Sequence, residues 1–321
     1  MTQARGELYD IGYQPYLGPR EGRSRARKAV WSSGVRTVLG MGRGVRAKVL
    51  PALLFLAAVA PALFFTMLVV IMGPVAGAVS HAEYYQLIAL ILVLFSAIMA
   101  PELLCPDRRD RVIDLYIVRP LTSVDYLAAR WLAFLAVTLS IAYAGQVVLF
   151  VGFTLAAEDQ VQYLRDNWLD VPRFLLAGLV IAAFTTTLPM AVSAFTTRRA
   201  YATAFVIGLY LISVTVAGAL TVCQEGGNGG EGGLRVTAGQ EADAATGECE
   251  RLAGDGAKWF ALVALSQVPA HVNALIFDER NDNEDARLVA ELPQGVLVTW
   301  YLLITAGPGA VLWWRYSRLG R

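Results

Sequence analysis

The sequence predicts an all-α polytopic membrane protein with six transmembrane helices. Of its 321 residues, 56% are hydrophobic and 17% are charged, whereas an ordinary soluble domain has about 45–50% apolar and about 25% charged residues. The apolar residues form long runs without a charged side chain, and basic and acidic residues collect in different connecting segments. These observations exclude a disordered chain and argue against a soluble enzyme.

Six uncharged runs approach or exceed the roughly 20 apolar residues that a helix needs to cross a bilayer. They are residues 49–80, 84–101, 131–157, 174–197, 200–224 and 292–314. We expect a membrane domain over 49–321, with spans at about 50–73, 85–104, 127–155, 172–196, 201–223 and 293–314.

A seventh uncharged run, 259–277, differs because it contains several polar residues and Pro269 near its middle. With six spans and both termini cytoplasmic, 20 of the 27 Lys and Arg residues lie inside, with only 8 of the 26 acidic residues. This agrees with the excess of basic residues in cytoplasmic loops. A full span at 259–277 would place the acidic segment 278–291 inside, so we expect a re-entrant or interfacial element there.

Residues 1–48 are predicted to form a cytoplasmic tail followed by an amphipathic interfacial helix. Between residues 24 and 49, apolar side chains recur near helical spacing among arginines and lysines. A cationic helix of this kind lies against anionic lipid headgroups. Residues 8–20 combine three tyrosines with Gly and Pro, which indicates either an extended docking segment or a disordered tail. Nucleic-acid binding is not expected, because the first span holds these arginines at the membrane.

The segment between the second and third spans, residues 101–135, carries the most specific pattern. Pro106 is expected to interrupt the second span, and Pro120 to end a short amphipathic helix over 107–118. Thr122 and Asp125 form an [ST]-x-x-[DE] capping signature at the start of the third span. A partner that holds such a short helix can move both spans. The alternative is an ordinary charged loop.

This segment resembles the coupling segment of ABC-2 type transporter permeases, the six-span transmembrane subunits of ABC exporters. Their segment typically reads E-R-x-x-G-T-L-x-x-L-L-x-x-P-L/V-S-x-x-E-F/Y and is followed by a Lys-led span. Asp107-Arg108 stands at the Glu-Arg pair, Pro120 at the proline turn and Arg130 at the lysine, whereas Arg111 replaces the glycine. The resemblance implies that the ATPase-coupling residues are Asp107, Arg108, Arg111, Asp114, Leu115, Tyr116, Arg119, Pro120, Leu121 and Tyr126.

The resemblance also implies the function, which is that of a permease subunit of an ATP-driven exporter in a bacterial plasma (inner) membrane. Its expected partners are ABC ATPase subunits, a second permease copy or a related permease, and the lipid bilayer. The chain has no G-x-x-x-x-G-K-[ST] phosphate loop. We therefore expect no enzyme activity and no bound cofactor on this chain, with ATP and Mg on the partner ATPase. The substrate and the residues that bind it are not predicted.

Two other functional classes compete with this interpretation. An integral-membrane enzyme or assembly scaffold with a cytoplasmic Arg/Asp loop is the alternative to a permease. A proton- or sodium-driven transporter is disfavoured, because such proteins normally place ionisable residues deep in their spans, and these spans are uncharged.

Cysteine and histidine residues give little further information. Cys223 and Cys249 flank a Gly-rich acidic loop on the expected outer side. Both a disulfide between them and two separate thiols are consistent with the sequence. His81 and His271 are the two histidines, and no carboxylate or cysteine stands at metal-ligand spacing from either. We therefore predict no metal site.

Overall fold

The computed structural model describes residues 22–42, 44–73, 79–110, 112, 121–221, 223–224, 250–251, 254–278 and 284–318. In this part of the chain the protein is helical, apart from one antiparallel pair of two-residue strands, β1 (Cys223–Gln224) and β2 (Glu250–Arg251). Six of the described helices are long and apolar enough to cross a membrane, which confirms the predicted fold class at this level. They are α2 (Val45–Met72), α3 (His81–Arg109), α5 (Ser123–Ala156), α7 (Asp170–Ser193), α8 (Arg199–Thr221) and α12 (Gln294–Ser317).

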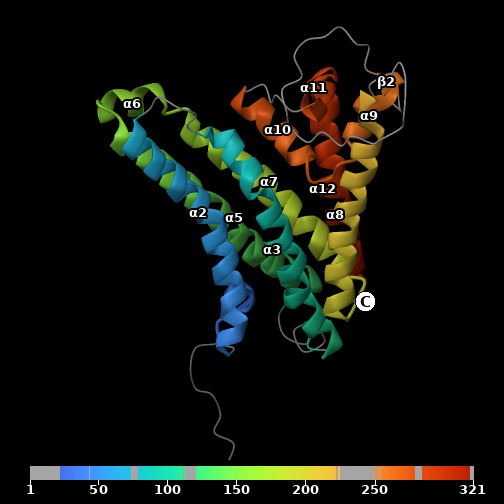
Figure 1. Ribbon diagram of the computed structural model, residues 1–321. Helices are drawn as coiled ribbons and strands as arrows, with labels where there is room; N and C mark the ends of the chain where they lie inside the picture. The colour runs from blue at the N-terminus through green and yellow to red at the C-terminus, as the bar shows by residue number, and fades with distance from the viewer. Residues whose placement is uncertain are drawn as a thin grey trace, which may run out of the picture.

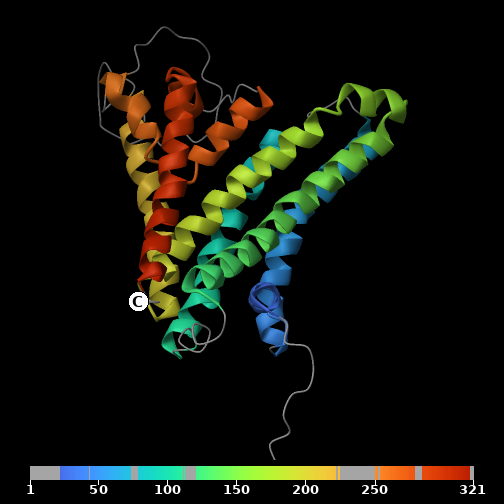
Figure 2. The same cartoon turned by 180° about the vertical axis from the view of Figure 1, so that it is seen from behind.

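The shorter elements lie at the two ends of these long helices (Figures 1 and 2). They are α1 (Arg23–Val38), α6 (Gln160–Asp166), a 3-10 turn (Gly254–Gly256), α9 (Ala257–Ala261), α10 (Val268–Phe277) and α11 (Glu284–Ala290). Helix α1 lies at the same end as the C-terminal ends of α3 and α12, whereas α6, α9, α10 and α11 lie at the other end. We name the first the arginine-rich end, after Arg23, Arg108, Arg130, Arg199 and Arg315.

Three long helices form the centre of the molecule and three lie outside them. In α3, α5 and α7, 50–61% of the residues in the most apolar stretch are buried, against only 17–22% in α2, α8 and α12. Helix α2 packs along α5, and both α8 and α12 pack on α7. The outer helices therefore present apolar side chains outward, the surface that lipid or a partner helix covers in a membrane.

Tyrosine hydroxyls on α3 join this helix to its neighbours through backbone carbonyl groups. Tyr84 donates to Ala58 O on α2 at 2.8 Å, and Tyr85 donates to Phe174 O on α7 at 2.7 Å. Gln146 on α5 donates to the carbonyl of His81 at 2.8 Å, and its amide oxygen lies 2.6 Å from the His81 ring. Buried polar groups in these spans therefore hold helices together.

Two of the described helices begin with a complete capping box. Thr122 and Asp125 exchange side chain-to-backbone hydrogen bonds at the start of α5, as their spacing predicts. Ser80 and Glu83 do the same at the start of α3. The second box has the same sequence signature but is not among the predicted caps, because Ser80 also ends the uncharged run of the first span.

The expectation that Pro106 interrupts the second span is wrong. Helix α3 continues through Pro101 and Pro106 to Arg109, and the Asp110 amide donates to the Pro106 carbonyl at 2.9 Å. Proline removes one backbone donor, but packing against neighbouring helices compensates within membrane-type bundles. The first residues of the short helix predicted over 107–118 therefore belong to α3. Of its later positions, 111 and 113–118 lie outside the described residues.

The predicted amphipathic segment 24–49 divides into two helices. Helix α1 ends at Val38 and α2 begins at Val45, with Gly40 and Gly42 at φ +67° and +83° between them. A side chain at Gly40 would also place its Cβ 2.3 Å from the Ala47 carbonyl oxygen. The turn depends on glycine because other residues rarely adopt a positive φ.

We expect Gly40→Ala to destabilise this turn by about 1–2 kcal/mol from backbone strain, and by more because of the contact with Ala47. Gly42→Ala is the matched control, since it meets the same strain but no atom within 4 Å. Limited proteolysis between α1 and α2 measures the effect. Equal cleavage rates in the two variants would contradict the assigned contact.

The uncharged run 259–277 is not one span-length helix. Helix α9 ends at Ala261, a turn follows, and α10 begins at Val268 with Pro269 in its first turn. Helix α10 packs against α3, α7 and α12. The prediction that this element is re-entrant or interfacial stays a prediction.

Candidate functional site: a buried ion-pair network at the arginine-rich end

The C-terminal end of α3 and the N-terminal part of α5 meet at Asp107. Its carboxylate accepts hydrogen bonds from the Tyr126 hydroxyl and from Nη2 of Arg130, both at 2.6 Å to Oδ2. The side chain of Arg130 is only 4% exposed and that of Asp107 is 17% exposed. Because Tyr126 and Arg130 are four residues apart on α5, they share one helix face, and that face receives Asp107.

Helix α1 covers the buried arginine. Val30, Gly34 and Val38 are the buried residues of α1. A Cβ at Gly34 would lie 2.7 Å from the Ala133 Cβ and 3.6 Å from the Arg130 side chain. Glycine therefore allows α1 to approach α5 closely enough to shield this ion pair from solvent, and shielding strengthens the attraction between the charges.

A second ion pair connects α1 directly to the cap of α5. Nη2 of Arg23 lies 2.6 Å from Oδ2 of Asp125, the same carboxylate that caps the helix with Thr122. Nη1 of Arg27 lies 4.0 Å from the other carboxylate oxygen. Both arginine side chains are 53% exposed, so these pairs orient α1 and contribute little stability.

The C-terminal end of α7 receives two arginines from other helices. Arg108 on α3 donates to the carbonyl oxygens of Ala194 and Thr196, and Arg315 on α12 donates to Ala194 O at 3.2 Å. The last carbonyl groups of a helix lack partners within the helix and carry partial negative charge. Cationic side chains therefore hold α3 and α12 to this end of α7.

Two further contacts extend the network to α8 and α12. Glu102 on α3 pairs with Arg199 at the start of α8, a partner that the sequence pattern does not reveal. Tyr316 on α12 stacks on Tyr126, with ring centroids 6.1 Å apart and an interplanar angle of 24°. We define the coupled network as these groups at the arginine-rich end: Glu102, Asp107, Arg108, Tyr126, Arg130, Ala194, Arg199, Arg315 and Tyr316.

The structure brings together three of the predicted coupling residues, Asp107, Arg108 and Tyr126. Leu121, also predicted, is buried just before α5. The others lie outside the described residues: Arg111, Asp114, Leu115, Tyr116, Arg119 and Pro120. Cys249 and the side chain of Cys223 are also outside them, so the suggested disulfide stays a prediction.

Arg130 is not among the predicted site residues, although the resemblance noted above places it at the position of a lysine. The available signal was the four-residue spacing from Tyr126 and the position of Arg130 directly before the uncharged run 131–157. Glu102, Arg199 and Arg315 are far apart in sequence, and no local pattern links them.

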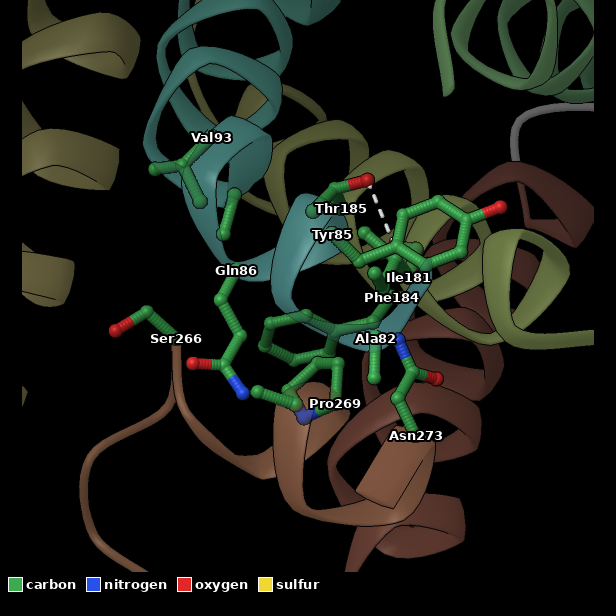
Figure 3. A pocket seen from close by; sticks show the side chains of 12 residues that line it. Ala82, Tyr85, Gln86, Val93, Ile181, Phe184, Thr185, Ser266, Pro269 and Asn273 are labelled. Carbon is green, nitrogen blue, oxygen red and sulfur yellow. Dashed lines mark hydrogen bonds between the residues drawn. The ribbon is translucent and has the colours of Figure 1, made fainter. Parts of the chain in front are cut away.

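A small, mostly apolar cavity lies elsewhere, between α3, α7 and α10 (Figure 3). Its volume of about 20 Å³ is enough for about one water molecule. The amides of Gln86 and Asn273 lie at this cavity, and neither amide atom of buried Asn273 bonds another described residue. None of the described side chains that line it is charged.

Among the residues that the structure describes, no group of three or more His, Cys, Asp or Glu side chains is arranged to hold a metal ion. The coupled network is therefore an arrangement of ion pairs and hydrogen bonds that fixes helix ends relative to one another.

Comparison with known proteins finds no matching family model and no matching curated protein.

Proposed function

We propose that this chain is the membrane-spanning permease subunit of an ATP-driven exporter of the ABC-2 type. It acts with separate ABC ATPase subunits and with a second copy of itself or a related permease. Its arginine-rich end faces the cytoplasm of a bacterial cell, in agreement with the excess of basic residues that cytoplasmic loops carry. The outer ends of its helices are those next to α6, α9, α10 and α11.

The observation that supports this proposal is the Asp107–Arg130 ion pair of the coupled network. This ion pair joins the C-terminal end of α3 to the N-terminal part of α5, the two helix ends that the intervening segment connects. An ATPase that holds this segment exerts force on both helix ends. Because the ion pair is buried, the two ends move together rather than separately.

The coupled network also gives the force a route to the other spans. Arg108 connects α3 to the end of α7, and Tyr126 connects α5 to α12 through Tyr316. Glu102 connects α3 to α8. A displacement at the segment between α3 and α5 is thereby carried into five of the six long helices, as alternating access requires.

The experiment is a purification of the full chain from its native membrane in mild detergent, followed by mass spectrometry and an ATPase assay on the eluate. Wild-type chain is expected to bring a nucleotide-binding subunit and vanadate-sensitive ATP hydrolysis. Leu115→Asp is expected to reduce both by about tenfold or more, the effect of losing one contact of about 1.4 kcal/mol. Leu164→Asp is the matched control, because Leu164 is exposed on α6 at the opposite end.

Wild-type chain recovered without any ATPase subunit would contradict the proposal, as would full recovery with Leu115→Asp. Either result would favour the alternative of an integral-membrane enzyme or assembly scaffold. Arg108→Gln provides a second variant, and it is expected to keep the ATPase subunit bound while lowering the stimulated ATP hydrolysis.

A further inference from the structure

An apolar groove runs between α7, α8 and α12 near the arginine-rich end. Its volume is about 640 Å³. The lining residues are Leu188, Ala191, Val192, Phe195, Thr196, Tyr201, Ala202, Phe205, Pro308 and Val311. The three aromatic side chains among them are well exposed, at 54% for Phe195, 63% for Tyr201 and 60% for Phe205. A groove of this composition, on the outer surface of membrane-type helices, accommodates an acyl chain.

Two arginines stand at the edge of this groove, each stacked on one of its aromatic side chains. The Arg198 guanidinium lies 5.5 Å from the ring centroid of Tyr201 and donates to its hydroxyl at 3.4 Å. The Arg315 guanidinium lies 5.0 Å from the ring centroid of Phe195 and donates to Ala194 O. Neither arginine forms an ion pair with another residue that the structure describes.

The charges around the groove therefore favour an anion. Glu102, an acid on the neighbouring α3, is already paired with Arg199. Arg198 and Arg315 are held in place by their aromatic and carbonyl contacts, so their remaining N–H groups are oriented before a ligand arrives. Arginine is well suited to a phosphate group because its planar guanidinium donates two hydrogen bonds at once.

We propose that this groove binds one anionic phospholipid, with an acyl chain against Phe205 and Val311 and the phosphate between Arg198 and Arg315. The occupant follows from the combination of an apolar groove and two arginines at one edge. Basic pockets between transmembrane helices on the cytoplasmic side bind anionic headgroups. The proposal requires that the chain lies in a membrane and is independent of any ATPase partner.

The first test compares two lipids with identical acyl chains on the purified, delipidated full chain. Phosphatidylglycerol carries a net negative charge, and phosphatidylcholine does not. Native mass spectrometry measures how many lipids of each kind stay bound. We expect one phosphatidylglycerol molecule to bind more tightly than phosphatidylcholine, by about fivefold for each arginine that contacts it. One basic residue near an anionic lipid contributes about 1 kcal/mol.

Arginine variants test the headgroup contact. Arg198→Gln is expected to reduce the preference for phosphatidylglycerol about fivefold, and the double variant R198Q/R315Q is expected to abolish it. Arg165→Gln is the matched control, because Arg165 is an exposed arginine on α6 at the opposite end. An unchanged preference in the double variant would overturn the proposal.

A tryptophan in the groove tests the acyl-chain contact. Val311→Trp is expected to weaken the binding of both lipids about tenfold, because the larger side chain fills the groove. Val298→Trp is expected to leave lipid binding unchanged. Both valines are on α12, with exposures of 43% and 41%, and Val298 does not line the groove. If Val311→Trp instead converts a dimer to a monomer and leaves lipid binding unchanged, a second copy covers the groove and the proposal is wrong.

Discussion

Asp107→Asn is expected to lower the stability of the protein more than any other single charge change at the arginine-rich end. The substitution keeps the shape of the side chain but removes the negative charge beside buried Arg130. Breaking a buried ion pair by neutralising one partner costs about 3 kcal/mol or more. We expect the melting temperature in detergent to fall by roughly 4–5 °C or more.

Asp110→Asn is the matched control, because it is the same substitution one helical turn later. Asp110 pairs with Arg109, and the two side chains are 52% and 63% exposed. Solvent screens such a pair, so no measurable change is expected. Equal melting temperatures in the two variants would contradict the role assigned to the Asp107–Arg130 pair.

A double variant separates the ion pair from other effects of these residues. In D107N/R130M both charges are absent, so neither is left in an apolar environment. Replacing both partners of a buried pair is often close to neutral. The double variant is therefore expected to be less destabilised than the sum of D107N and R130M, and an additive result would show that the two side chains act independently.

Gly145→Ala is expected to be the most damaging glycine substitution in the spans. A Cβ at Gly145 on α5 would lie 1.6 Å from the hydroxyl oxygen of Tyr84 and 2.3 Å from its Cζ. Tyr84 is fully buried and donates to Ala58 O, so the ring has no free space to move into. The variant loses this hydrogen bond and overpacks the contact between α2, α3 and α5, at a cost of about 3 kcal/mol.

Gly208→Ala on α8 is the matched control, since no atom lies within 4 Å of the position that a Cβ would take there. At this site the substitution is expected to leave the melting temperature unchanged or to raise it slightly, because alanine favours a helix over glycine by about 1 kcal/mol. The two variants should therefore shift the melting temperature in opposite directions. A shift of the same sign and size would contradict the close contact at Gly145.

The two glycines also show the limit of prediction from sequence. Both lie in the interior of apolar helices, and no local sequence rule says which of the two is closely packed. Only the packing of α3 against α5 makes Gly145 irreplaceable, whereas a Cβ at Gly208 would meet no atom within 4 Å. The same holds for Arg130, whose burial depends on the approach of α1 through Gly34.

The sequence by itself determined the features that depend on neighbouring residues: the six long apolar helices and the cap at Thr122 and Asp125. A helix satisfies its own backbone hydrogen bonds, so an apolar run of sufficient length is enough to specify it. The tertiary structure alone decided that α3 continues through Pro106 and that Glu102 pairs with Arg199, 97 residues away. Such features depend on which helix faces pack together, and this packing depends on residues from all parts of the chain.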